Sequence, residues 1–228
     1  MVLGLIVIVA IVALAYLPQL WVQGVISRHS KERADFPGTG GEFARHILDQ
    51  MKLTHVGVEE TREGDHYDPK DKVVRLLPQH MNKRSLSAVV IAAHEVGHAM
   101  QDATEYGPLK TRTSLAKIAQ RIESTGSVVM LAAPILLLVT KSPAGMILSY
   151  LAGAIILSAT ILLHAMTLPV EFDASFKRAL PVLKEGGYLK DRDLGKARHI
   201  LKAAAYTYVA AAAMSLLNVA RWFRVIRF

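Results

Sequence analysis

Four long apolar runs constrain the fold of this chain more than any other feature of its sequence. A helix needs about 20 mostly apolar residues to cross the hydrocarbon core of a bilayer. The runs are MVLGLIVIVAIVALAYL at 1–17, SVVMLAAPILLLVT at 127–140, AGMILSYLAGAIILSATILLHAMTL at 144–168 and AAAYTYVAAAAMSLLNVA at 203–220. The first and third are long enough, the second is short and the fourth is rich in alanine. The sequence therefore predicts an integral membrane protein with three transmembrane helices, or four if the last run also spans.

The first run has two interpretations. Residues 13–15, Ala-Leu-Ala, look like the cleavage site of a signal peptide. A signal peptide begins with a positively charged region, however, and the first charged residue here is Arg28. We therefore expect an uncleaved membrane anchor at the N-terminus.

The charge pattern favours a membrane topology over a nucleic-acid partner. The net charge is +8, but no basic patch interleaved with aromatic residues stands out. Loops rich in Lys and Arg stay on the cytoplasmic side, which predicts a multi-pass protein of the cytoplasmic membrane with residues 23–123 and 169–202 facing the cytoplasm. A fourth span would place the arginines near the C-terminus outside the cell, which conflicts with this orientation. Either the orientation or the fourth span is therefore left open.

The chain has no cysteine, so disulfides and thiolate metal sites are excluded.

A hydrophilic region of about a hundred residues separates the first two runs. Residues 39–50 have the apolar spacing of a short amphipathic helix. Residues 55–60 and 72–77 have strand-like patterns, and the Gly-, Asp- and Pro-containing linker between them predicts a β-hairpin with an elaborated loop. A further helix is expected from about residue 85 to residue 101. The chain is thus expected to comprise an anchor at 1–22, a hydrophilic region at 23–123 that contains this helix, a transmembrane hairpin at 124–168, a loop and helix at 169–202, and an alanine-rich transmembrane helix with a basic tail at 203–228.

The motif HEVGH lies on this last helix of the hydrophilic region. Residues four apart share one face of a helix, so His94 and His98 can present two imidazoles to one ion while Glu95 projects toward a bound water. Zinc takes neutral imidazole ligands, and a catalytic site keeps one position open for water, whose pKa the metal lowers to about 7. A carboxylate can accept the proton of that water. The motif predicts one Zn²⁺ per chain, with the histidines as ligands and Glu95 as the catalytic base.

A catalytic zinc site also needs a third protein ligand. No histidine follows the motif at the short spacing of H-E-x-x-H-x-x-G-x-x-H. Residues 167–175, TLPVEFDAS, follow the third apolar run, and a membrane hairpin would return them to the side of the two histidines. Glu171 is the candidate ligand, and the alternative is a solvated carboxylate at a helix start. Pro169 suits the first turn of a new helix.

At these residues the chain resembles the YugP-type membrane zinc metallopeptidases of bacteria and archaea. The matching stretches, in family order from about residue 38 to 215, are GGEFARHILDQ, DHYDPKDKVVRLL, SAVVIAAHEVGHAMQ, TLPVEFDAS and KAAAYTYVAAA. The resemblance implies an integral membrane peptidase with one zinc ion, His94 and His98 as ligands, Glu95 as the base and Glu171 as the third ligand. The wider similarity is to HtpX-like membrane proteases, whose third ligand is also a glutamate just beyond a later membrane helix.

The sequence departs from those relatives at one position. They have an aspartate four residues after the ligand glutamate, where this chain has Ser175. Asp173 is the alternative candidate for a carboxylate that steadies a ligand histidine. His66 is a candidate for stabilising the oxyanion, although it could equally belong to a turn. Tyr208 could reach the same site or could instead pack between helices.

The sequence as a whole predicts a mainly α integral membrane protein with three or four transmembrane helices and a zincin-like catalytic unit that contains a small β-hairpin. Its expected function is that of a zinc-dependent endopeptidase, embedded in the lipid bilayer and acting on membrane or membrane-proximal proteins or peptides. The alternative is a zinc-binding membrane scaffold or metal-handling protein without proteolytic activity. Such a protein would have no need of Glu95.

Overall fold

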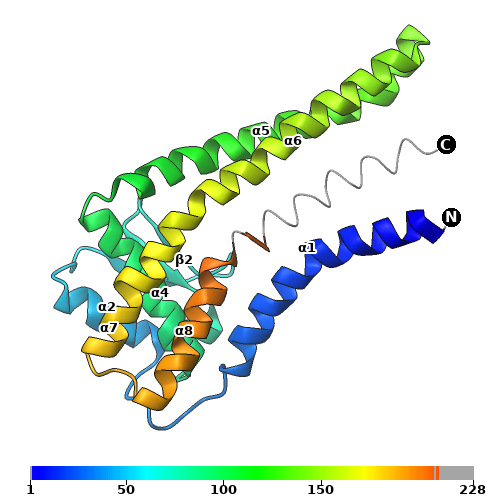
Figure 1. Cartoon of the computed structure of the whole chain (residues 1–228). Coiled ribbons are helices and arrows are strands. Elements are labelled where there is room, and N and C mark those ends of the chain that lie inside the picture. The colour runs from blue at the N-terminus through cyan, green and yellow to red at the C-terminus, as the bar shows by residue number, and fades with distance from the viewer. Residues whose placement is uncertain (1, 208, 211–228) are drawn as a thin grey trace. The chain divides into compact units, whose positions relative to one another are not determined.

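The computed structural model of the 228-residue chain describes residues 2–207, 209 and 210 (Figure 1). It is mainly helical, with one small sheet whose strands lie between residues 57 and 76 of the chain. In chain order the elements are α1 (Val2–Arg28), α2 (Gly40–Gln50), β1 (Gly57–Glu60), β2 (His66–Asp68), β3 (Val73–Leu76), α3 (Pro78–Met81), α4 (Leu86–Ala103), α5 (Gly107–Thr140), α6 (Pro143–Phe172), the π-helix η1 (Asp173–Ala179), α7 (Leu180–Glu185) and α8 (Asp191–Ala205).

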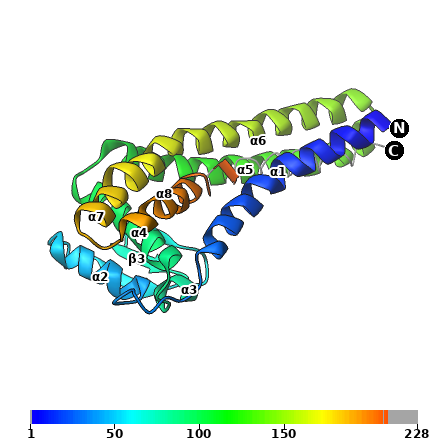
Figure 2. The ribbon, with the colours of Figure 1, turned by 60° about the horizontal axis from the view of Figure 1, so that its bottom comes forward.

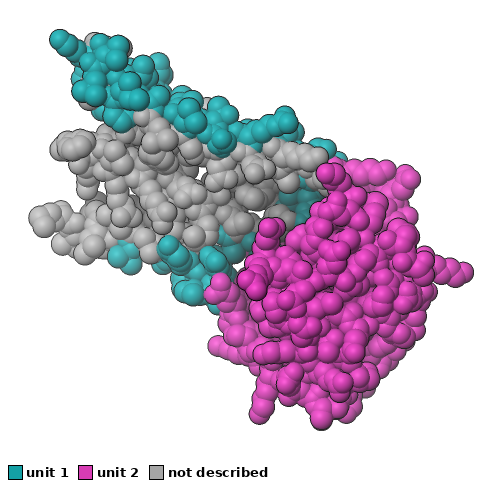
Figure 3. All heavy atoms as spheres, turned by 180° about the vertical axis from the view of Figure 1, so that it is seen from behind, with its two compact units in different colours: residues 1–20, 111–168, 207–228 teal, residues 21–110, 169–206 magenta. Residues whose placement is uncertain are grey.

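The chain divides into two compact units, which are coloured separately in Figure 3. One unit comprises residues 1–20, 111–168 and 207–228, and the other comprises residues 21–110 and 169–206. The second unit contains the sheet, α2, α4, η1, α7 and α8, together with the candidate metal ligands.

Helix α2 begins where the sequence pattern places it, because its first turn has a complete capping box. The Thr39 hydroxyl accepts a hydrogen bond from the backbone N–H of Glu42, and the Glu42 carboxylate accepts one from the backbone N–H of Thr39. These two bonds satisfy N–H groups that have no partner within the helix. Ile47 and Leu48 are buried on the inner face, as their spacing predicts.

The small sheet is mixed, and the predicted hairpin between its first and last strands is wrong. The strand order is β1-β3-β2, with β1 parallel to β3 and β2 antiparallel to β3. The segment predicted as a loop contains β2, which runs opposite to both neighbours in the chain, so the chain reverses twice and β1 and β3 run in the same direction. The only hairpin among the described strands is β2–β3, whose turn has Lys72 at a positive φ of 55°.

Helix α4 lies at the centre of the second unit. Every residue from Leu86 to Ala99 is buried, as expected for a helix that is apolar on nearly all sides. The Ser85 hydroxyl caps its N-terminus by accepting from the N–H of Ala88. The helix contacts α2, α8, η1 and the sheet, and Figure 2 shows α4 with α2, α8 and β3 around it. The two histidines of the motif are therefore inside the unit.

The predicted transmembrane helices and multi-pass topology are not found. Within the part of the chain that the structure describes, none of the helices has both the length and the apolar character required for a membrane span. The prediction rested on the apolar runs of the sequence alone, and a helix that is apolar on all sides can be buried in protein as well as in a membrane. The run at 127–140 is only the second half of α5, whose first half carries Lys110, Arg112 and Arg121. The fourth run lies mostly outside the described residues.

Helix α6 also differs from the expectation at its end. Pro169 does not start a new helix, because α6 continues through it to Phe172 and leads directly into η1. The turns of a π-helix are wider than those of an α-helix, and such turns are frequent at functional sites. Glu171 therefore lies next to a change in helical geometry.

Candidate metal centre

Three buried side chains from two helices converge at one point. The Nε2 atoms of His94 and His98 each lie 3.3 Å from Oε2 of Glu171. The potential ligand atoms of the three residues all lie within 4.8 Å of one another. Their exposed fractions are 4%, 2% and 1%, so the cluster is enclosed by protein.

The backbone packing of α4 against η1 brings the third residue to the first two. The histidines are one turn apart on α4, and their ring centroids are 4.8 Å apart. Gly97 lies opposite the backbone of Ala174, and a Cβ atom at position 97 would be only 2.7 Å from the Ala174 carbonyl oxygen. Any larger side chain would push the two helices apart. Glu171 lies one turn before Ala174, within reach of the histidines.

The Nδ1 atoms of both histidines contact polar residues that the sequence analysis did not assign to the site. His94 Nδ1 is 3.0 Å from the hydroxyl of Ser175, and His98 Nδ1 is 2.8 Å from Oε1 of Gln101. Ser175 is noticeable in the sequence only as a departure from the wider relatives. Gln101 follows His98 by three residues on the same helix, and this spacing was the one signal that could have revealed it.

Asp173 contacts neither histidine. Its carboxylate accepts hydrogen bonds from Nε2 of Gln101 at 2.9 Å and from Nε of Arg178 at 2.8 Å. Burial alone would raise the pKa of Asp173, but these hydrogen bonds and the charge of Arg178 outweigh it and lower the pKa below its ordinary value. Asp173 is thus an ionised group that reaches His98 through Gln101.

The other predicted residues lie in different surroundings. His66 is on β2, and its Nδ1 bonds to the carbonyl oxygen of Gly64 at 2.8 Å. Tyr67 beside it is buried and donates to Asp102 at 2.6 Å, and burial together with this bond raises the pKa of Tyr67. Tyr208 lies outside the described residues. Glu95 follows His94 on α4 and is 6% exposed.

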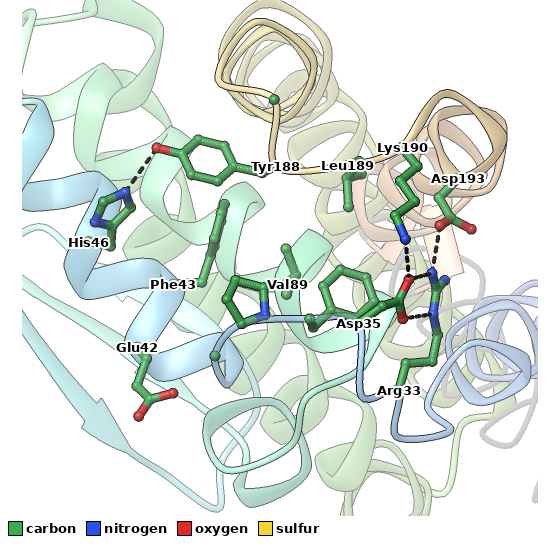
Figure 4. Close-up of a pocket in the computed structure, with 14 residues that line it drawn as sticks. Arg33, Asp35, Glu42, Phe43, His46, Val89, Tyr188, Leu189, Lys190 and Asp193 are labelled. Atoms are coloured by element: carbon green, nitrogen blue, oxygen red, sulfur yellow. Dashed lines mark hydrogen bonds and ion pairs between the residues drawn. The ribbon is translucent and has the colours of Figure 1, made fainter.

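A separate cavity of about 580 Å³ lies elsewhere in the same unit (Figure 4). Phe43 and Val89 contribute to its apolar wall, and Arg33, Asp35 and Asp193 gather at one end. None of the three converging residues lines this cavity. Its charged groups already bond to one another, so the cavity offers no set of converging ligand atoms comparable to the buried cluster.

The donor set suits a catalytic zinc ion. Two imidazole nitrogens and one carboxylate oxygen are the three protein ligands of a common class of zinc hydrolase site, in which the fourth position holds water or substrate. Both histidines also have a hydrogen-bond partner on the nitrogen that faces away from the cluster, as is usual for metal-ligating histidines. The site therefore fits one zinc ion.

Comparisons with known proteins point the same way. Residues 4–227 match the model of a family described as "Putative neutral zinc metallopeptidase". The chain is 37% identical over 220 residues to a Bacillus subtilis (strain 168) protein named "Putative membrane protease YugP", with 94% of this chain and 92% of that protein covered. No solved structure matches the chain.

Proposed function

This chain belongs to the neutral zinc metallopeptidase family, and we propose that it hydrolyses peptide bonds with a water activated at the cluster of His94, His98 and Glu171. As a member of that family it is a zinc metallopeptidase, and its substrates are proteins or peptides.

The observation that carries the proposal is the buried convergence of two imidazole nitrogens on one carboxylate oxygen. At such a site zinc lowers the pKa of a water molecule to about 7 and polarises the scissile carbonyl. Glu95 takes the proton of the attacking water and later passes it to the leaving amine. Its place next to His94 on α4, and its burial, support this role.

The edge of the small sheet is the proposed binding surface for the substrate backbone. The strand order leaves one side of β2 unpaired within the sheet, and an extended peptide can bind such an edge by adding a strand. Tyr67 on β2 and Lys72 after it both bond to Asp102 on α4, which ties this edge to the helix with the histidines. His66 on the same strand remains a candidate for stabilising the oxyanion.

The proposed substrates are membrane proteins or proteins close to a membrane. Two observations support this choice. The Bacillus subtilis relative is named a membrane protease. In addition, large apolar side chains are exposed on α1, α5 and α6, among them Leu17 at 61%, Leu138 at 77% and Ile155 at 72%. Such surfaces mark sites of membrane or protein contact.

Zinc content and proteolysis of three variants test the proposal. We expect Glu95→Gln to keep one zinc per chain and to cleave an unfolded protein substrate at least about 100-fold more slowly, because it lacks the base. Glu171→Ala should lose zinc and activity together. Glu185→Gln, which changes an exposed glutamate in α7, is the matched control and should behave like the wild type.

Two results would count against the proposal. If the wild type binds zinc but cleaves nothing that Glu95→Gln spares, a zinc-binding scaffold or metal-handling protein becomes the better explanation. If Glu171→Ala retains zinc, another residue is the third ligand. Equal cleavage of soluble and membrane-anchored versions of one substrate would refute only the preference for membrane-proximal substrates.

A further inference from the structure

The hydrogen bonds around Ser175 have a defined direction. A backbone carbonyl can only accept, so the Ser175 hydroxyl donates its hydrogen to the carbonyl oxygen of Leu201 in α8, 3.2 Å away. The Ser175 oxygen must then accept in its other hydrogen bond, the 3.0 Å contact with His94 Nδ1. His94 therefore carries its proton on Nδ1, and its Nε2 keeps a lone pair.

Gln101 has the same effect on His98. Its amide nitrogen donates to the backbone carbonyl of Val170 at 2.8 Å and to the Asp173 carboxylate at 2.9 Å. The carbonyl cannot donate, so the nitrogen must face this side and Oε1 must face the histidine. That oxygen accepts from His98 Nδ1 at 2.8 Å. The proton of His98 is thus also on Nδ1.

We propose that Ser175 and Gln101 are positioning residues that hold both ligand histidines as the Nδ1–H tautomer, so that both Nε2 lone pairs face the metal position. This inference rests on the ligand set of the proposed function. Without these partners an imidazole could place its proton on Nε2, where Glu171 is 3.3 Å away and would accept it. That proton would have to move before zinc could bind.

Burial makes these two partners difficult to replace. Ser175 and Gln101 are both 0% exposed, so a truncated side chain leaves the histidine nitrogen with no ready access to bulk water. Gln101 has a second effect, because its bond to Val170 ties α4 to the residue directly before Glu171. Truncation of Gln101 should therefore weaken zinc binding more than truncation of Ser175.

Zinc affinity of the full-length protein, measured by competition with a chelator, tests the inference. Ser175→Ala and Gln101→Met should each bind zinc about 10- to 100-fold more weakly than the wild type, the usual effect of removing a partner of a ligand histidine. Ser87→Ala is the matched control, since Ser87 is also 0% exposed but its hydroxyl bonds to the hydroxyl of Ser85 rather than to a ligand histidine.

A second measurement requires no substitution and therefore does not depend on the folding of any variant. In zinc-loaded wild type labelled with ¹⁵N-histidine, two histidines should carry hydrogen on Nδ1 and metal on Nε2. A proton on Nε2 of either ligand would overturn the inference, as would unchanged zinc affinity in both Ser175→Ala and Gln101→Met. In those cases the proposed function would stand if Glu171→Ala still lost zinc. Retention of zinc by Glu171→Ala would instead overturn the ligand set, and this inference with it.

Discussion

At the scale of single residues, the candidate site depends on the absence of a side chain at Gly97. A Cβ atom there would be 2.7 Å from the backbone oxygen of Ala174, and backbone atoms can relieve such a contact only by moving. We expect Gly97→Ala to lower the free energy of unfolding by about 1–3 kcal/mol, the usual cost of overpacking. Zinc affinity should also fall, because Glu171 would move away from the histidines. Chemical denaturation and chelator competition measure the two effects.

Gly195 provides the control for this substitution. It lies in α8, where a new Cβ would meet no atom within 4 Å. Gly195→Ala should therefore stabilise the protein slightly, because alanine has the higher helix propensity. If Gly97→Ala is as stable as Gly195→Ala, the backbones of α4 and η1 do not pack this closely at Gly97.

The sequence suggested the candidate metal ligands more readily than their hydrogen-bond partners. The spacing of His94 and His98 follows from helix geometry alone, and Glu171 could be proposed from its place after an apolar run together with the family resemblance. The pairing of Ser175 with His94 joins residues 81 positions apart. No local pattern encodes such a contact, because it depends on how η1 packs against α4.

At the scale of elements, the N-terminus of α8 is fixed by an ion cluster around Asp193. The Asp193 carboxylate is 2.7 Å from Arg33 and 3.2 Å from Lys196. The hydrogen bond from Arg33, together with Lys196, outweighs the effect of burial and lowers the pKa of Asp193 to about 2, from an ordinary value of 3.8. The resulting stabilisation is complete above about pH 4 and disappears as the pH falls toward 2, because the unfolded chain binds the proton more tightly.

Asp193→Asn should remove this pH dependence. The depression of the Asp193 pKa corresponds to a contribution on the order of 2 kcal/mol at neutral pH. Between pH 7 and pH 2.5 the wild type should therefore lose more unfolding free energy than Asp193→Asn, in denaturant titrations of the zinc-free proteins. Asp191→Asn, an exposed carboxylate in the same helical turn, is the control and should follow the wild type. Identical pH profiles for the wild type and Asp193→Asn would contradict the role of the cluster.

The positions of the elements were more predictable than the connections between them. The helix over 39–50 was predicted correctly because its apolar spacing and capping residues are local. The strands at 57–60 and 73–76 were also located, but their relative direction depends on the path of the intervening chain. That path is determined by β2, a strand of only three residues. It was not predicted, because it lies in a segment that contains turn residues. The prediction that a new helix begins at Pro169 was wrong as well, because α6 continues through this residue.

At the scale of the whole molecule, the family and the zinc cofactor were predicted correctly, whereas the membrane-spanning architecture was not. The zinc motif and the matching stretches are specific combinations of residues, so they identify the chemistry even without a structure. Apolar runs are less specific, because an apolar helix can belong to a protein core as well as to a membrane span. The described residues support only a mainly helical fold with a small mixed sheet.

Zinc should also stabilise the fold, because its proposed ligands lie far apart in the sequence. Glu171 in α6 and His98 in α4 are 73 residues apart, so a bound ion would close a long loop and hold α4 against the end of α6. For Glu95→Gln, which avoids self-cleavage, free zinc at 100 times the dissociation constant should add about 2.7 kcal/mol to the free energy of unfolding. Thermal unfolding with zinc or with a chelator measures this effect, and the midpoint of unfolding should continue to rise with zinc concentration.

The double variant Glu95→Gln/Glu171→Ala should show almost no response to zinc. An equal zinc response in both proteins would mean that the ion stabilises the fold from a different site.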